Sequence, residues 1–222
     1  MIKKVLVICS GGMDSITLAH MISSNPDMEL KGLVCFDYGQ RHSKEILYAK
    51  TCAEKLNVSF TLVPIPNLGE LLKSSLTFDG QIPKGSYNQE NMTSTVVPNR
   101  NAIMLSIAFG IGSSMNVDMI AIAVHGGDHF IYPDCRPEFL KTFDEMQQLA
   151  LQGLSSPRLY APYKNMSKSE IAVIAKQLDL DIVETWSCYE GGESHCGLCG
   201  TCIERKQAVN DSGVKDSTAY LS

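Results

Sequence analysis

The sequence predicts an α/β fold with a doubly wound, mostly parallel sheet and a small cysteine-rich segment at its C-terminal end. Short β-branched runs alternate with stretches whose apolar residues recur at helical spacing, which is typical of strand–helix–strand units. The first run ends in a Gly-Gly turn, and four of the eight cysteines crowd between Cys188 and Cys202. We therefore expect one domain over residues 1–180 and a separate segment over residues 181–222.

The composition is that of a water-soluble globular protein. Of the 222 residues, 44% are hydrophobic and 19% are charged, and the formal net charge is −5. An acidic chain is a poor match to a protein whose main task is to grip nucleic-acid phosphates. No apolar run reaches the ~18 residues of a membrane span, and no signal peptide precedes the first strand. We expect a cytoplasmic protein with no membrane or direct nucleic-acid partner.

The first strand, Val5–Cys9, leads into the loop Ser10–Ser15 (Ser-Gly-Gly-Met-Asp-Ser), and a helix is expected to start near Asp14 or Ser15. Two glycines allow the backbone to approach an anion, and the positive end of the helix points to the same place. The loop therefore predicts a pyrophosphate site. It lacks the Gly-Lys-Ser/Thr ending of the Walker loop and the Gly-x-Gly-x-x-Gly spacing of the dinucleotide motif, and it resembles the PP-loop of ATP pyrophosphatases. The alternative is an ordinary turn that Asp14 caps.

The second strand is expected over residues 30–36, followed by a helix over 43–56 and a third strand over 58–63. Between this second strand and its helix lies Asp37–His42, at the end of the sheet where such folds bind ligands. Arg41 is a candidate for bridging phosphates and Gln40 for reading the edge of a heterocycle. The alternative is a solvent-exposed stretch before the helix.

Residues 64–97 are less regular, with a short helix expected over 67–73 and a loop rich in Ser, Gly, Asn and Pro over 74–97. Connections of this length in compact domains are often lids, and we expect an active-site flap. A helix follows over 102–115. Arg100, just before it, is a candidate contact for an anion or triphosphate.

A fourth strand is expected over residues 118–124, and the polar stretch His125–Phe139 follows it. Asp128 and Asp134 are candidates for holding magnesium or for bonding the imino edge of a purine-like base, and Arg136 for holding a carboxylate. The alternative is a loop held by its own hydrogen bonds. Pro137 suits the first turn of a helix that runs to about residue 152.

A short strand is expected over residues 158–161. Ser167 and Glu170 form the pattern of a capping box at the start of a helix that runs to residue 177. Lys168, in its first turn, can reach a phosphate or remain solvated. Residues 179–185 are expected to form a short strand or a link to the cysteine-rich segment.

The cysteine-rich segment contains Cys188 and then the pattern Cys196-Gly-Leu-Cys199-Gly-Thr-Cys202. Four thiolates satisfy tetrahedral zinc and leave no open position, so the pattern favours a structural site. His195 can replace one cysteine as a ligand. An iron–sulfur cluster uses the same ligands and redox-active thiols are a third alternative.

Together these motifs resemble the 7-cyano-7-deazaguanine synthases, the nitrile-forming ligases of queuosine-precursor (preQ0) biosynthesis. The matching segments follow one another along nearly the whole chain: residues 10–15, 38–42, 97–101, 132–139, and Ser187-Cys188-Tyr189 with the Cys-Gly-x-Cys-x-x-Cys pattern. Residues 128–131, Asp-His-Phe-Ile, depart from the Asp-Phe-Ser-Gly of some members.

The resemblance implies an adenine nucleotide alpha hydrolase-like (PP-loop) domain and the conversion of 7-carboxy-7-deazaguanine to the nitrile with ammonia and ATP. The implied cofactors are ATP, magnesium and one structural zinc ion, and related enzymes suggest a homodimer. The implied residues are Ser10, Gly11, Gly12, Met13, Asp14 and Ser15 for ATP; Asp14, Arg100 and Lys168 for catalysis; Gln40, Arg41, Asp128, Tyr132, Asp134 and Arg136 for the substrate; and Cys188, Cys196, Cys199 and Cys202 for zinc.

Two alternative functions remain at this point. One is another PP-loop enzyme, which modifies tRNA or joins a deazapurine to a macromolecule. The other is a zinc-stabilised nucleotide-binding module without catalysis, which would bind ATP but release no pyrophosphate.

Overall fold

A computed structural model describes residues 1–77 and 80–222 and contains a parallel sheet with the strand order β3-β2-β1-β4-β5. The strands span Lys3–Ile8 (β1), Met28–Asp37 (β2), Ser59–Pro64 (β3), Met119–Ala121 (β4) and Arg158–Tyr160 (β5). The chain adds strands on one side of β1 and then turns to the other side. This reversal is the signature of a doubly wound sheet, so the predicted fold class is confirmed.

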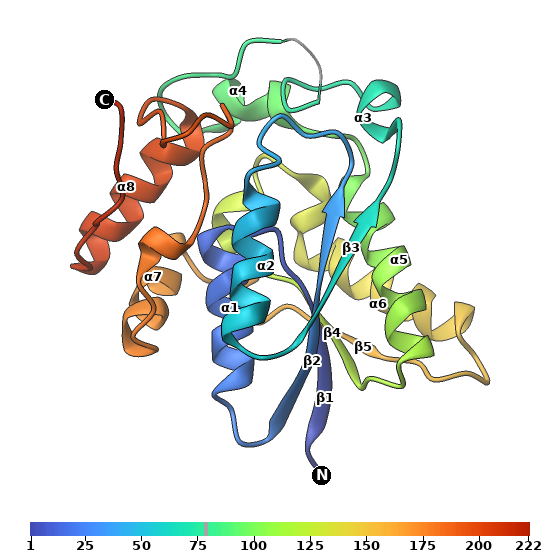
Figure 1. The fold of residues 1–222 in the computed structure, drawn as a ribbon. Coiled ribbons are helices and arrows are strands. Elements are labelled where there is room, and N and C mark those ends of the chain that lie inside the picture. Colours follow the sequence, from blue (N-terminus) through green and yellow to red (C-terminus); the bar gives the residue numbers. More distant parts are fainter. Residues whose placement is uncertain (78–79) are drawn as a thin grey trace.

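Helices cover both faces of the sheet (Figure 1). On one side lie α1 (Met13–Ser23), α2 (Glu45–Lys55) and α7 (Lys168–Gln177), and on the other lie α5 (Arg100–Ser114) and α6 (Pro137–Ala150). Beyond the carboxyl ends of the strands are α3 (Leu68–Leu71), α4 (Gln89–Met92) and the last helix, α8 (Gly200–Ser212). Short 3-10 turns span Thr93–Thr95, Gly126–Asp128, Pro133–Cys135 and Ile182–Glu184.

The first strand shows why the core has two halves. Val5 and Val7 pack with the apolar residues of α1 and α7, whereas Leu6 and Ile8 pack on the opposite face with residues of α5. Side chains of a strand alternate between the two faces of a sheet. Because both faces are covered, all four are buried, and the strand reads as a continuous apolar run.

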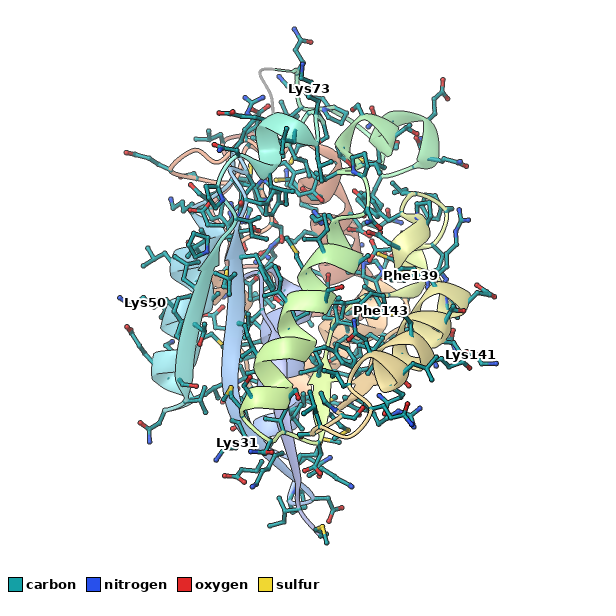
Figure 2. All side chains as sticks on the ribbon, turned by 90° about the vertical axis from the view of Figure 1, so that its right-hand side faces the viewer. Lys31, Lys50, Lys73, Phe139, Lys141 and Phe143 are labelled. Atoms are coloured by element: carbon teal, nitrogen blue, oxygen red, sulfur yellow. The ribbon has the colours of Figure 1, made fainter. Side chains whose placement is uncertain are left out.

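The outer helix α6 is amphipathic and packs on α5 through aromatic rings. Phe143 contacts Phe109 of α5 edge to face at 5.9 Å between ring centroids, and Phe139 lies 5.5 Å from Phe143. Figure 2 shows Phe139 and Phe143 on the inner side of α6, while Lys141 extends away from the molecule. Aromatic pairs in this arrangement contribute about 0.5–1.5 kcal/mol beyond the area they bury.

The main differences from the sequence predictions are in the fourth strand and the last helix. The fourth strand is shorter than expected, because the chain leaves the sheet soon after Ala121 and enters the turn Gly126–Asp128. Residues 179–185, predicted as a short strand or a link, form a link with a 3-10 turn. Helix α8 was not predicted, because the residues it buries include Gly200, Thr201 and Arg205 instead of an apolar stripe.

The predicted loop over residues 74–97 is anchored by side chains with little exposure. Leu76, Ile82 and Met92 belong to the core, and α4 and the turn Thr93–Thr95 lie within the loop. Residues 78–79, which also belong to the predicted flap, lie outside the described residues. Across the two described ranges, no helix combines the length and apolar character needed to cross a membrane.

Candidate active site

A cavity of about 210 Å³ lies beyond the carboxyl ends of β1 and β4. These two strands are neighbours in the sheet, and the chain winds away from them in opposite directions. Open α/β sheets bind their ligands at this switch point. The cavity has two sides: the loop after β1 with charged side chains around it, and a group of tyrosines around Arg100.

The loop after β1 is fixed by its glycines. Gly11 has φ +93°, and a Cβ atom there would lie 2.0 Å from the backbone oxygen of Glu45. The Gly11 carbonyl accepts a hydrogen bond from the Trp186 amide at 2.8 Å. Gly12 is the N-cap of α1, so the first amides of that helix are free to bind an anion in the cavity.

Two serines complete this loop. The Ser10 and Ser15 hydroxyls share a hydrogen bond of 3.3 Å, and Ser15 Oγ also donates to the Gly12 carbonyl at 3.2 Å. Ser10, Gly12, Met13, Asp14 and Ser15 all line the cavity, whereas Gly11 acts through the backbone packing that its missing side chain permits. The loop thus has the geometry of an anion site.

Lys168 joins the loop to the last helix. Its Nζ lies 3.0 Å from Asp14 Oδ2 and 2.9 Å from Glu204 Oε2, and the side chain is only 12% exposed. Burial alone would lower the pKa of Lys168, but the carboxylates of Asp14, Glu204 and Asp128 raise it above its usual range. The lysine therefore carries a full positive charge beside the loop.

His125 lies at the centre of the same charged group. Its Nδ1 accepts a hydrogen bond from the Gly127 amide at 3.1 Å, so the proton of the neutral ring is on Nε2. That Nε2 faces three carboxylates: Asp14 at 3.8 Å, Asp128 at 3.6 Å and Glu204 at 3.8 Å. The side chain of His125 is 2% exposed. The carboxylates of Asp14, Asp128 and Glu204 thus surround His125 and Lys168, and burial raises the pKa of the Glu204 carboxyl above its usual value.

Arg100 and three tyrosines form the other side. Arg100 donates to the Tyr38 hydroxyl at 3.4 Å, and the Tyr132 hydroxyl bonds Thr95 Oγ1 at 2.8 Å. Burial lowers the pKa of Arg100, but Tyr38, Tyr189 and Tyr132 raise it by more. Among the described residues, no carboxylate lies within ion-pair distance of Arg100, so its charge is available to an anionic ligand.

Glu45 and His42 add two buried groups that are neutral near pH 7. Burial raises the pKa of Glu45 to about 8, against the opposing effect of Arg100. Burial and the charge of Arg100 lower the pKa of His42 to about 3. Glu45 Oε1 and His42 Nε2 are 3.5 Å apart, and His42 Nδ1 has no hydrogen-bond partner within residues 1–77 and 80–222. Both side chains face the cavity.

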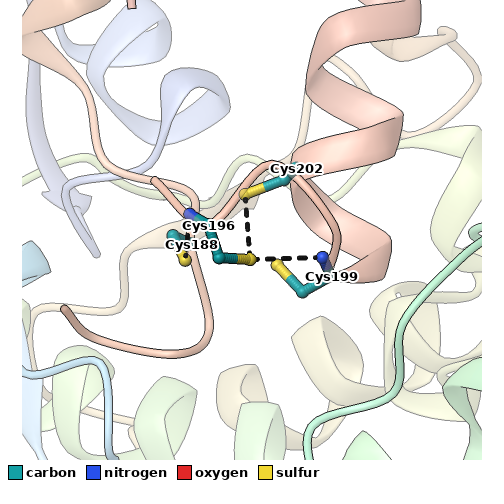
Figure 3. Close-up of side chains that lie close together, drawn as sticks. All are labelled: Cys188, Cys196, Cys199 and Cys202. Carbon is teal, nitrogen blue, oxygen red and sulfur yellow. Dashed lines mark hydrogen bonds between the residues drawn. The ribbon is translucent and has the colours of Figure 1, made fainter. Parts of the chain in front are cut away.

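The four predicted metal ligands come together at the start of α8. The sulfur atoms of Cys188, Cys196, Cys199 and Cys202 lie within 4.8 Å of one another, and regular tetrahedral coordination at 2.3 Å separates sulfurs by about 3.8 Å. Cys196 Sγ accepts the amide of Cys199 at 3.3 Å and lies 4.0 Å from Cys202 Sγ (Figure 3). Since sulfur donors of this number suit a metal such as zinc, the site fits the predicted ion.

His195, the alternative ligand, is engaged elsewhere. Its Nε2 accepts the Ser187 amide at 3.2 Å, and its ring stacks on Trp186 at 4.3 Å between centroids. The cysteines therefore form the four-ligand set without the histidine.

Comparison with known proteins identifies the family. The model of "Queuosine biosynthesis protein QueC" matches residues 4–213. This chain belongs to that family. It is 52% identical over 218 residues to the 7-cyano-7-deazaguanine synthase of Rhizobium johnstonii, with 98% of this chain and 92% of that one covered. The Agrobacterium fabrum synthase is 53% identical with the same coverage. The predicted family is therefore confirmed.

Solved structures give only distant likenesses. An NMN synthetase from Francisella tularensis is 13% identical with a TM-score of 0.49, covering 97% of this chain and 79% of that one. A U34-tRNA thiolase from Methanococcus maripaludis is 16% identical with a TM-score of 0.48, covering 80% of this chain and 58% of the thiolase.

Four of the six predicted substrate residues of this QueC-family chain lie outside the cavity lining. The Gln40 side chain bonds the Tyr38 amide at 2.9 Å and the Phe36 carbonyl at 3.0 Å. Arg41 bonds the Gly80 carbonyl and pairs with Glu190 at 3.8 Å. These side chains brace the loop after β2, because their polar groups are engaged within the protein.

The other two of these four residues, Asp134 and Arg136, lie after β4. Asp134 Oδ2 accepts the Asn101 amide at 2.9 Å and so caps α5, and Arg136 Nε donates to the His129 carbonyl at 2.8 Å. Only Asp128 and Tyr132 of the six line the cavity. Arg100 and Lys168, the two candidate phosphate contacts outside the loop Ser10–Ser15, also line the cavity.

Several cavity residues were not singled out in the sequence. Glu45 is the first residue of α2, and Tyr87, in the irregular stretch before α4, donates to Asp128 Oδ1 at 3.0 Å. Glu204, in the unpredicted α8, lies behind the cavity and contacts its lining residues Lys168 and His125. Tyr189 had a signal, since it follows Cys188 in the family pattern. Glu45 and Glu204 carried none, because a lone glutamate on a helix usually faces water.

Proposed function

We propose that this chain is an ATP-dependent ligase that converts 7-carboxy-7-deazaguanine and ammonia into 7-cyano-7-deazaguanine. The observation that carries the proposal is one cavity with an anion-binding loop on one side and, on the other, the Arg100 guanidinium, which has no carboxylate partner among the described residues. The relatives named for this reaction match 98% of the chain.

The reaction needs two activations. A carboxylate is a poor electrophile, because its oxygens leave badly. Attack of the carboxylate oxygen on the α-phosphorus of ATP expels pyrophosphate and gives an acyl adenylate. Ammonia then displaces AMP and forms the amide. A second ATP adenylates the amide oxygen, and loss of AMP with two protons gives the nitrile. No step requires a nucleophilic side chain, so catalysis consists of positioning and charge stabilisation.

The two sides of the cavity suit the two halves of this chemistry. The amides at the start of α1, the hydroxyls of Ser10 and Ser15, and the ammonium of Lys168 are placed to hold the phosphates. Arg100 is placed to hold the substrate carboxylate, and Asp128 and Tyr132 to bind the deazapurine. Tyr38 and Tyr189 supply flat apolar surfaces for the bases.

We assign the metals by the donors that this chain offers. Cys188, Cys196, Cys199 and Cys202 hold one zinc ion, which supplies structural cross-linking. Asp14 would hold magnesium: in the described part of the chain its buried Oδ1 has no hydrogen-bond partner, while Oδ2 pairs with Lys168. Carboxylate oxygens are suitable ligands for this ion, which would offset the charge of the departing pyrophosphate.

We further propose that the enzyme acts on small molecules in the cytoplasm as a homodimer, with residues 1–180 as catalytic domain and 181–222 as zinc-binding segment. All eight cysteines, which are in the described part of the chain, are free. Thiols persist in a reducing compartment. The net charge of −5 supports a small substrate over a nucleic acid.

The test is turnover by the purified protein with ATP, magnesium, ammonia and 7-carboxy-7-deazaguanine, followed by mass spectrometry. We expect a product that has lost two oxygens and gained one nitrogen, and release of pyrophosphate that depends on the acid. Reactions without ammonia serve as controls and should stop at the adenylate. ATP binding without acid-dependent pyrophosphate release would contradict the proposal, as would turnover that requires a macromolecule.

A further inference from the structure

The first two turns of helix α8 are fixed at their start by the cysteine site and further along by Arg205. Cys199 is its N-cap and Cys202 lies in its first turn, so the cysteine site fixes where the helix begins. Arg205, fully buried, donates to Thr185 Oγ1 at 2.7 Å, Ser187 Oγ at 3.1 Å and Thr218 Oγ1 at 2.9 Å. A residue between these anchors has a well-defined position.

Glu204 is that residue, and it faces the active site. It follows Cys202 by two positions, or about 200° around a helix, and so points away from the cysteines. Its Oε2 accepts Lys168 Nζ at 2.9 Å, and Oε1 faces His125 Nε2 at 3.8 Å. Its side chain is only 13% exposed. Solvent therefore screens this ion pair less than it screens exposed ion pairs, which contribute little to stability.

Lys168 is shared between two carboxylates that come from different elements. The distances to Asp14 and Glu204, 3.0 and 2.9 Å, are nearly equal. Without the carboxylate of Glu204, Lys168 keeps only Asp14 of these two ion-pair partners, and we expect the ammonium to shift towards Asp14. Both side chains would then be misplaced for a phosphate ligand.

We propose that Glu204 is a positioning residue that holds Lys168 at the anion-binding loop and so connects the cysteine site to the active site. The inference rests on the proposed function, because it gives Lys168 the task of binding ATP phosphates. It assigns to the cysteine-rich segment a part in ATP use in addition to its structural part.

The first experiment compares Glu204→Gln and Glu204→Asp with the control Asp211→Asn, which removes an exposed charge from the same helix. For Glu204→Gln we expect kcat/KM for ATP to fall roughly tenfold or more, the usual effect of losing a charged hydrogen-bond partner. The KM for the acid should change less than twofold. Glu204→Asp should recover part of the loss, and Asp211→Asn should match the wild type. Zinc content should stay the same in all variants.

The second experiment separates positioning from general packing by combining Glu204→Gln with Lys168→Met. If Glu204 acts through Lys168, its substitution has no further effect on ATP kinetics in the Lys168→Met background. Equal losses in both backgrounds would overturn the proposal, and so would wild-type ATP kinetics in Glu204→Gln.

Calorimetric titration with ATP, without the acid, keeps this proposal distinct from the proposed function. Weaker ATP binding by Glu204→Gln supports the positioning role even if the wild type forms no nitrile. Unchanged ATP affinity, with wild-type nitrile formation intact, contradicts the positioning role alone.

Discussion

Lys168 keeps its charge at a nearly buried position because carboxylates from two other elements receive it. Asp14 belongs to the loop after β1 and Glu204 to α8. On the opposite side of the cavity, Arg100 has tyrosine hydroxyls around it in place of carboxylates. The two cations therefore differ in the partners they already have. Lys168 pairs with two carboxylates of the protein, whereas Arg100 is available to an anionic ligand.

Asp14→Ala tests the loop at the level of one side chain. We expect loss of turnover by a factor of at least ~1,000, because the variant loses both a partner of Lys168 and the carboxylate offered to magnesium. The protein should remain folded, since Asp14 lies at the rim of the sheet. Activity and circular dichroism measure the two effects. Nitrile formation at the wild-type rate would exclude the assigned role.

Glu45→Gln tests the buried acid through the pH dependence of stability. The pKa of Glu45 is raised from 4.5 to about 8, so the folded protein binds the proton more tightly than the unfolded chain does. Stability from this group is therefore present below pH ~4.5 and is lost as the pH rises towards 8, by up to about 1.4 kcal/mol per pH unit.

Glu45→Gln should thus unfold at nearly the wild-type denaturant concentration at pH 5 and at a higher one at pH 8. Urea unfolding at the two pH values gives the measurement. The pKa of His42 is lowered to about 3, so the stability that this residue contributes is lost in the opposite direction, as the pH falls from 6.5 towards 3. Because both proteins contain His42, this effect is the same in each. A difference that stays constant with pH would contradict the raised pKa.

At the scale of elements, the start of α5 shows how a loop residue that is distant in sequence can cap a helix. Asn99 precedes the helix in the left-handed region and gives no side-chain cap. Asp134, which follows Asn101 by 33 residues in the chain, accepts the Asn101 amide and caps the helix instead. An acidic side chain also interacts favourably with the positive end of a helix.

Asp134→Ala distinguishes this capping role from substrate binding. We expect a loss of about 1–2 kcal/mol in unfolding free energy, because a buried amide loses its partner. Asp134→Asn, which keeps an oxygen acceptor, should recover much of that loss. The KM for the acid should stay within twofold of the wild type in Asp134→Asn. A large rise in that KM without a change in stability would instead support a substrate contact.

Elements with a strong local signal were predictable from the sequence, and those set by tertiary contacts were not. The loop Ser10–Ser15 and the capping box of Ser167 and Glu170 appear where the pattern placed them, because turns and caps depend on neighbouring residues. Helix α8 and the position of Asp134 depend on partners far along the chain. Single-sequence patterns contain no information on those partners.

At the scale of the whole molecule, the strand order brings distant segments to one cavity. Residues after β1, after β2, at the start of α5 and after β4 meet there, and the cysteine-rich segment adds Trp186, Tyr189 and Thr201. The amide of Trp186 bonds the Gly11 carbonyl, so this segment closes on the first loop. The family pattern could identify the chemistry because its motifs are the segments that meet.

Cys199→Ser tests the dependence of the whole molecule on the cysteine site. We expect lower zinc content and a loss of several kcal/mol in stability, because the metal cross-links residues that the fold must otherwise hold. Metal analysis and thermal unfolding provide the measurements, with Cys135→Ser as the control for loss of a buried thiol. An unchanged metal content would refute the four-cysteine site.

The closing of the cysteine-rich segment on the first loop has a consequence for how the enzyme matures. During synthesis the loop after β1 leaves the ribosome early, whereas α8 with Glu204 leaves nearly 200 residues later. Contacts with such sequence separation form late in folding. A nascent chain can therefore build the sheet and its anion-binding loop while Lys168 still lacks its second partner, Glu204.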